Sequence, residues 1–150
     1  MKKFLFAIGL FFLFVTGVSA KDITVYLFHS ETCPHCREER EFLQEYTSEH
    51  SNVKLKLYEV SNDMGNSELL DKVKESFDCS NSYVPYTVIG EVGLTGFDEN
   101  RKNEIIHFIE KYQNEEYRDV VSEVIKTGKA VKIDKKEEVE DDSKTKKKHY

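Results

Sequence analysis

The sequence has few cysteines, and their spacing does not suit a scaffold held together by disulfides. Its 150 residues contain three, at positions 33, 36 and 79, and the first two share one C-x-x-C motif. Small domains stabilised by disulfides spread several pairs along the chain, so this class of fold is excluded. The odd count leaves Cys79 without an obvious partner.

An excess of positive charge and long apolar segments are also missing from most of the chain. The formal net charge is −6, and no basic cluster forms a face that could neutralise phosphates, which excludes nucleic acid as a partner. No segment after residue 20 is apolar enough to cross a bilayer. No internal repeat is present, so the length predicts one domain with tails.

The one long apolar run lies at the N-terminus. Lys2 and Lys3 precede an unbroken apolar stretch at 4–15, and small residues at 18–20 match the pattern that signal peptidase reads. Residues 1–20 are therefore predicted to be a signal peptide cleaved after Ala20. The alternative is an uncleaved N-terminal anchor, because residues 4–20 reach the lower limit for spanning a bilayer. Both readings place the domain outside the cytoplasm, as a secreted, periplasmic or cell-surface protein.

Residues 21–132 carry alternating strand and helix patterns, whereas residues 133–150 are nearly all polar or charged and are predicted to be a disordered tail. The expected elements are a strand at 22–30, a helix from Pro34, a strand at 52–61, a helix at 66–77, a hairpin with arms at 87–89 and 91–94, a helix after Asp98, and a last helix at 117–125 that stops at Gly128. Strands joined by a helix are parallel, and a hairpin adds antiparallel pairing. The predicted fold is therefore α/β, a small mixed four-stranded sheet flanked by helices on both faces.

The motif Cys33-Pro34-His35-Cys36 stands between the first expected strand and the first expected helix. Pro34 suits the first helical position, so Cys33 would lie beside the free N–H groups of the first turn, which stabilise negative charge. Since the thiolate is the nucleophile in disulfide exchange, Cys33 is predicted to be exposed and to attack first. Cys36 is predicted to be more buried and to resolve the mixed disulfide. His35 either adds positive charge near the sulfurs or is a solvated residue without a tuning role.

Other readings of the two cysteines are weaker. A structural disulfide across two residues removes little entropy from the unfolded chain. A zinc or copper(I) site would need further ligands from Cys79, His29 or His35, because no second metal-binding pair exists. Haem attachment is excluded, since Arg37 stands where that motif requires histidine. A redox-active pair is favoured, with no cofactor beyond its own disulfide and no metal.

Two stretches together resemble the thioredoxin superfamily: the CPHC motif after a strand, and Val84-Pro85 before a hairpin that carries glycines. The resemblance covers roughly residues 23–112. The Pro34-His35 dipeptide is similar to that of the DsbA-type thiol oxidases, whereas the size and the hairpin look more like glutaredoxins. The resemblance implies a thioredoxin-like fold in which Pro85 is cis beside the cysteines. It also implies that the backbone of Val84 bonds extended substrate chains.

The sequence departs from these relatives at three positions. Leu27 stands where thioredoxins and DsbA-like proteins have a buried acid, so proton transfer to or from Cys36 needs another group, and His29 is the nearest candidate in the sequence. His35 and Ser30 replace a tyrosine and a lysine that glutaredoxins often have, which argues against use of glutathione.

The sequence thus predicts an extracytoplasmic thiol–disulfide oxidoreductase, a monomer acting on protein thiols and disulfides through Cys33 and Cys36. Pro34-His35 and the location favour the oxidase or isomerase direction. The alternatives are a reductase fed by a membrane redox partner, a metal-binding module, and a docking domain whose cysteines no longer turn over. Cys79 is either a further resolving or regulatory thiol or a small buried residue.

Overall fold

The computed structural model describes residues 20–134, so the predicted signal segment up to residue 19 and the predicted tail from residue 135 lie outside the described residues. Within that range the elements are β1 (Ile23–His29), α1 (Pro34–Glu49), β2 (Val53–Glu59), α2 (Met64–Ser76), β3 (Tyr86–Ile89), β4 (Val92–Thr95), α3 (Glu99–Asn114) and α4 (Val120–Thr127). None of these helices combines the length and the apolar character needed to cross a membrane.

The four strands form one mixed sheet in the order β2-β1-β3-β4. β1 and β2 are parallel, with Ile23 opposite Val53 at one end and His29 opposite Glu59 at the other. β3 is antiparallel to both β1 and β4. The predicted mixed four-stranded sheet is confirmed.

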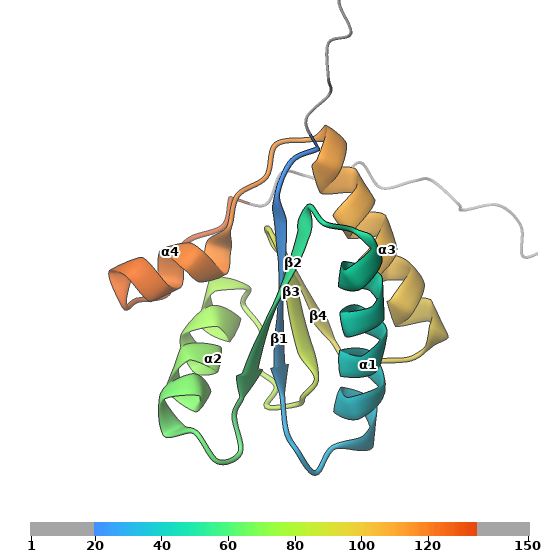
Figure 1. The fold of residues 1–150 in the computed structure, drawn as a ribbon. Helices are drawn as coiled ribbons and strands as arrows, with labels where there is room; N and C mark the ends of the chain where they lie inside the picture. The colour runs from blue at the N-terminus through green and yellow to red at the C-terminus, as the bar shows by residue number, and fades with distance from the viewer. Residues whose placement is uncertain (1–19, 135–150) are drawn as a thin grey trace, which may run out of the picture.

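Helices cover both faces of this sheet, as predicted, and each face has its own apolar core. α1 and α3 lie on one side and α2 and α4 on the other (Figure 1). Alternate residues of β1 enter the two cores because successive side chains of a strand point to opposite faces. Val25 and Leu27 pack in the cluster that includes Leu43 of α1, whereas Tyr26 and Phe28 pack in the cluster that includes residues of α2 and α4.

Three helices begin behind an aspartate whose carboxylate accepts a hydrogen bond from the backbone N–H three residues ahead. They are Asp63 before α2, Asp98 before α3 and Asp119 before α4. Such caps satisfy free donors of the first turn. The cap at Asp63 starts α2 at Met64, two residues before the predicted start. The cap at Asp119 starts α4 at Val120, so Tyr117 lies before the helix and not within it.

The apolar side chains that alternate with lysines along β2 are unevenly buried. Val53 is 4% exposed, but Leu57 is 39% exposed. β2 is one of the two edge strands of the sheet, and its side chains are therefore covered less completely than those of the central strands. The alternating pattern correctly predicted the strand and which of its residues face the core. How deeply those residues are buried depends on the place of the strand in the sheet.

Candidate active site

Cys33 caps the N-terminus of α1. Its backbone is extended, with φ −92° and ψ 116°, and Pro34 takes the first helical position. The Cys33 Sγ accepts a hydrogen bond from the backbone N–H of Cys36 at 3.2 Å. A sulfur thus stands where an N-cap oxygen usually stands, and the dipole of a 16-residue helix favours negative charge on it.

The two sulfurs of the motif differ in access. Both cysteines are free thiols; Cys33 is half-buried, whereas Cys36 is only 1% exposed. Burial, followed by the neighbouring Cys33 and a smaller contribution from Glu39, raises the pKa of the Cys36 thiol to about 12. Cys33 is therefore the sulfur that a substrate can reach, and Cys36 lies behind it as a protonated thiol.

The backbone at Val84 and Pro85 lies next to Cys33. The Cys33 thiol donates to the Val84 carbonyl oxygen, with 3.8 Å between sulfur and oxygen. The Val84–Pro85 peptide bond is cis, and the Pro85 carbonyl accepts a hydrogen bond from the Gly96 N–H at 2.9 Å. The fold thus brings the backbone just before β3 against the sulfur at the start of α1.

A buried lysine holds the loop that leads to Pro85. Lys74 of α2 is only 4% exposed, and its Nζ donates to the carbonyls of Asn81 at 3.0 Å and Tyr83 at 2.8 Å. The same ammonium group lies 4.9 Å from the centre of the Tyr86 ring. Burial lowers the pKa of Lys74. Lys74 could not be recognised from the sequence, because a lysine in a helix is usually exposed.

A buried acid lies on the same helix as the cysteines. Glu39 is 0% exposed, and its Oε1 accepts a hydrogen bond from the Thr87 hydroxyl of β3. Its Oε2 is also buried and has no hydrogen-bond partner among the described residues. Burial raises the pKa of Glu39 to about 7, while the Thr87 hydrogen bond and the charge of Arg101 lower it. Sequence reasoning missed this residue, although Cys36, Glu39 and Leu43 share one face at spacings of three and four.

The two histidines considered from the sequence, His35 and His29, differ in their exposure to solvent. His35 is exposed, with its Nδ1 3.7 Å from Glu38 Oε2. His29 is buried at the end of β1, its Nδ1 has no hydrogen-bond partner in the described part of the chain, and burial lowers its pKa. The charges that act on Cys36 come from Cys33 and Glu39, not from His29.

Cys79 lies in the loop after α2. Its sulfur accepts a hydrogen bond from the Asn81 side-chain amide at 3.2 Å, and the residue packs against the core on the α2 and α4 side of the sheet. Its hydrogen bonds thus tie it to the end of α2 and to the loop that precedes Pro85 rather than to the C-x-x-C motif. Across residues 20–134 no group of three or more His, Cys, Asp or Glu residues is placed to hold a metal ion.

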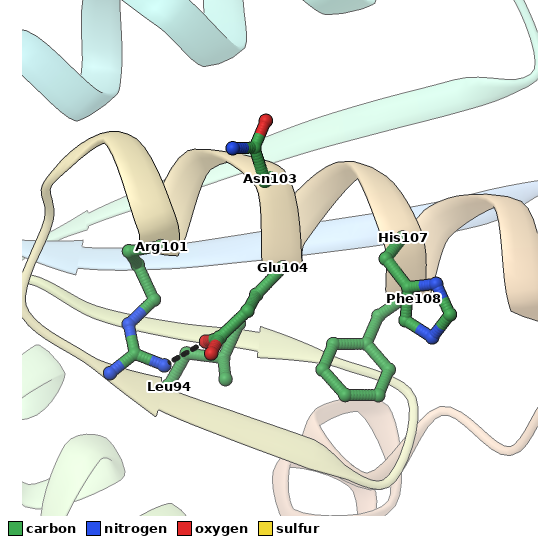
Figure 2. Close-up of a pocket in the computed structure, with 6 residues that line it drawn as sticks. All are labelled: Leu94, Arg101, Asn103, Glu104, His107 and Phe108. Atoms are coloured by element: carbon green, nitrogen blue, oxygen red, sulfur yellow. Dashed lines mark hydrogen bonds and ion pairs between the residues drawn. The ribbon is translucent and has the colours of Figure 1, made fainter.

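A shallow depression of about 500 Å³ lies elsewhere, between β4 and α3. Figure 2 shows its lining, in which Arg101 and Glu104 form an ion pair. The lining residues are Leu94, Arg101, Asn103, Glu104, His107 and Phe108. None of the site residues predicted from the sequence belongs to it, so the depression is separate from the cysteine centre.

Comparisons with known proteins bear on the fold. No protein-family model matches the sequence, and no curated protein matches it. Solved structures do match. A protein from Agrobacterium tumefaciens is 15% identical, with a TM-score of 0.50, and the match covers 73% of this chain and 48% of that one. The chain therefore spans about half the length of that protein.

Two further matches have descriptive names. A glutaredoxin from Archaeoglobus fulgidus is 23% identical over 57% of this chain and 86% of its own, with a TM-score of 0.42. A thioredoxin-like protein from Clostridium perfringens is 22% identical over 66% of this chain and 76% of its own, with a TM-score of 0.47. The mixed four-stranded sheet and the helices on both of its faces agree with the fold expected from the sequence. The fold is thioredoxin-like. Likenesses at these identities concern the fold of this thioredoxin-like domain alone.

Proposed function

We propose that the protein is a thiol–disulfide oxidoreductase that exchanges disulfides with protein substrates through Cys33 and Cys36. One observation carries the proposal: the Cys33 sulfur accepts the Cys36 N–H at the N-terminus of α1, with the Cys36 thiol buried behind it. This placement stabilises the form of sulfur that attacks disulfides and also makes it a good leaving group.

The exchange proceeds in two steps. The Cys33 thiolate attacks one sulfur of a substrate disulfide; a bond between Cys33 and that sulfur forms, and the other substrate sulfur leaves and takes up a proton. Cys36 then attacks the Cys33 sulfur, which forms the Cys33–Cys36 disulfide and releases the second substrate thiol. Two electrons pass from the protein dithiol to the substrate disulfide. The same steps in reverse oxidise a substrate dithiol.

The backbone at Val84 is the proposed contact for the substrate chain. Its carbonyl lies 3.8 Å from the Cys33 sulfur, and the Lys74 ammonium group holds the carbonyl of the preceding residue, Tyr83. An extended peptide bearing the target cysteine would pair with this short length of backbone in the manner of an added strand. Backbone pairing fixes the approach of the chain without requiring one particular substrate sequence.

The oxidase or isomerase direction and an extracytoplasmic location are proposed as well. The Pro34-His35 dipeptide and its resemblance to thiol oxidases support the direction. The N-terminal pattern of two lysines followed by an apolar run supports the location. A reductase supplied with electrons by a membrane partner is the second candidate, because a difference of about 30 mV, or 1.4 kcal/mol, is enough to change the direction of exchange.

The test measures activity and potential on the same preparation. The protein is equilibrated with a dithiothreitol or glutathione couple, and its disulfide exchange is assayed with a reduced, unfolded substrate protein. We expect Cys33→Ser to abolish exchange and Cys79→Ser to retain it. A potential between about −120 and −180 mV supports the oxidase or isomerase direction, and one near or below about −270 mV supports a reductase. Unchanged exchange in Cys33→Ser would contradict the proposed function.

A further inference from the structure

The second step of exchange requires Cys36 to lose a proton inside the protein. With a pKa of about 12, almost none of this thiol is ionised at neutral pH. Its side chain is 1% exposed, so bulk water has little access to it. A group that takes the proton as the sulfur attacks would accelerate this step.

Glu39 lies close enough to Cys36 in the helix to accept its proton and has an unpartnered carboxylate oxygen to do so. It lies one helical turn after Cys36 on α1, and residues three apart are neighbours on one helix face. The two side chains interact electrostatically. One carboxylate oxygen is occupied by the Thr87 hydroxyl, whereas Oε2 is buried without a hydrogen-bond partner among the described residues. A buried, unpartnered carboxylate oxygen carries a desolvation cost, which a role in proton transfer would explain.

The groups around the carboxyl group come from three further elements. β3 contributes Thr87, and α3 contributes the charge of Arg101, both of which favour the ionised form. β1 contributes the apolar Leu27, which lies opposite Thr87 in the sheet register. His29, further along β1, interacts instead with Arg40, Glu59 and Glu31. Cys33 and Cys36 are the titratable neighbours on α1 itself, acting on each other.

These opposing influences bring the pKa of Glu39 close to neutral pH. Burial is the largest effect and raises the pKa of Glu39 to about 7 in spite of Thr87 and Arg101. A group with such a pKa exists in both protonation states at physiological pH, so it can accept a proton in one direction of exchange and return it in the other.

We propose that Glu39 is the proton acceptor and donor for Cys36, a role that rests on the proposed disulfide exchange. As Cys36 attacks, its proton passes to the Glu39 carboxylate. The Cys33–Cys36 bond then forms, the bond between Cys33 and the substrate breaks, and the departing substrate thiolate takes a proton from water. In the reverse direction Glu39 returns the proton to Cys36. The acid thus comes from helix α1, whereas β1 contributes the apolar Leu27 opposite Thr87.

Single-turnover kinetics separate the two steps. In a Cys79→Ser background, 5,5′-dithiobis(2-nitrobenzoate) reacts with Cys33 and releases one thionitrobenzoate, and attack by Cys36 releases the second. We expect the rate of the second release to rise with pH around a midpoint near 7. Glu39→Gln, which keeps an acceptor for Thr87, should slow the second release at pH 7 on the order of a hundred-fold and abolish that midpoint. The first release should change less than two-fold.

Two further variants distinguish proton transfer from a structural role. Glu41→Gln, on the exposed side of the same helix, should behave as the parent protein does. Thr87→Val keeps the acid but removes a hydrogen bond that lowers its pKa, so the midpoint should move to higher pH even if Glu39→Gln folds poorly. An unchanged second release in Glu39→Gln, or an unchanged midpoint in Thr87→Val, would overturn the role of Glu39. If the parent protein releases no second thionitrobenzoate, the proposed exchange itself fails.

Discussion

Glu39 makes the stability of the protein depend on pH. Burial raises the pKa of its carboxyl group from the ordinary 4.5 to about 7, so the folded state keeps a proton that the unfolded chain has released. The stability contributed by this proton is complete below pH 4.5 and is lost as the pH rises through 7. The raised pKa corresponds to a total loss on the order of 3 kcal/mol once the carboxyl group is ionised in the folded state.

The Glu39→Gln variant has no such proton to lose. We therefore expect the free energy of unfolding of the parent protein to fall relative to that of Glu39→Gln between pH 5 and pH 8, as measured by urea denaturation at a series of pH values. A constant difference between the two proteins across this range would contradict the burial of an ionisable carboxyl group at this position.

Lys74 is the second charged side chain with a buried role. Replacing it by methionine removes the donor for the Asn81 and Tyr83 carbonyls while keeping a side chain of similar length. Because hydrogen bonds that involve a charged group contribute about 1.5–3 kcal/mol, we expect Lys74→Met to lower the free energy of unfolding by roughly that amount. Lys72→Met on the same helix is the matched control, and equal denaturation midpoints for the two variants would disprove the anchoring role.

The hairpin of β3 and β4 depends on a glycine for its packing. An added Cβ at Gly93 would lie 2.1 Å from the Tyr86 hydroxyl oxygen, and Tyr86 is itself only 1% exposed. We expect Gly93→Ala to displace this ring and to destabilise the protein by about 1–3 kcal/mol, as measured by thermal or urea unfolding. Gly65→Ala in α2 is the control, since its Cβ would make only an ordinary contact at 3.4 Å. Equal stability of the two variants would contradict this packing.

The elements could largely be predicted from the sequence because their signals are local. The β-branched run gave β1, Pro34 gave the start of α1, and Asp98 gave the cap of α3. The exact starts of α2 and α4 were wrong, because the caps Asp63 and Asp119 were not recognised as such. Turn glycines likewise placed the hairpin, and all four strand ends lie within one residue of the predicted ones.

The buried charges could not be predicted in the same way. The fully buried residues of α1 are Cys36, Glu39 and Leu43, whereas the aromatic Phe42 and Tyr46 are only partly buried. Which side of a helix faces the sheet is decided by tertiary packing, and an acidic residue on that side reads as solvent-exposed in the sequence. The spacing of Glu39 from Cys36 and Leu43 was the one available signal.

The whole molecule brings four separate parts of the chain to one place. The end of β1 leads into Cys33, α1 carries Cys36 and Glu39, the loop held by Lys74 leads to Val84, and β3 supplies the Thr87 hydroxyl. No single helix, strand or loop supplies this centre. Because these segments meet at the two cysteines, we expect the free energy of unfolding of the whole domain to differ between the dithiol and the disulfide form.

For an oxidase, the reduced form is the more stable one. We expect the dithiol protein to unfold at a higher urea concentration than the protein with the Cys33–Cys36 disulfide. The difference should be about 1.4 kcal/mol for each 30 mV by which the potential of the pair exceeds that of the same pair in the unfolded chain. Greater stability of the oxidised form would contradict the oxidase direction and favour the reductase.

Trapping the mixed disulfide tests the central claim most directly. In Cys36→Ser the second step cannot occur, so a substrate that forms a disulfide with Cys33 stays attached. We predict that this variant, incubated with a disulfide-containing unfolded protein, forms a covalent adduct through Cys33 that dithiothreitol cleaves and that mass spectrometry of the joined peptides identifies. The absence of an adduct, or an adduct through Cys79 alone, would show that Cys33 is not the attacking sulfur.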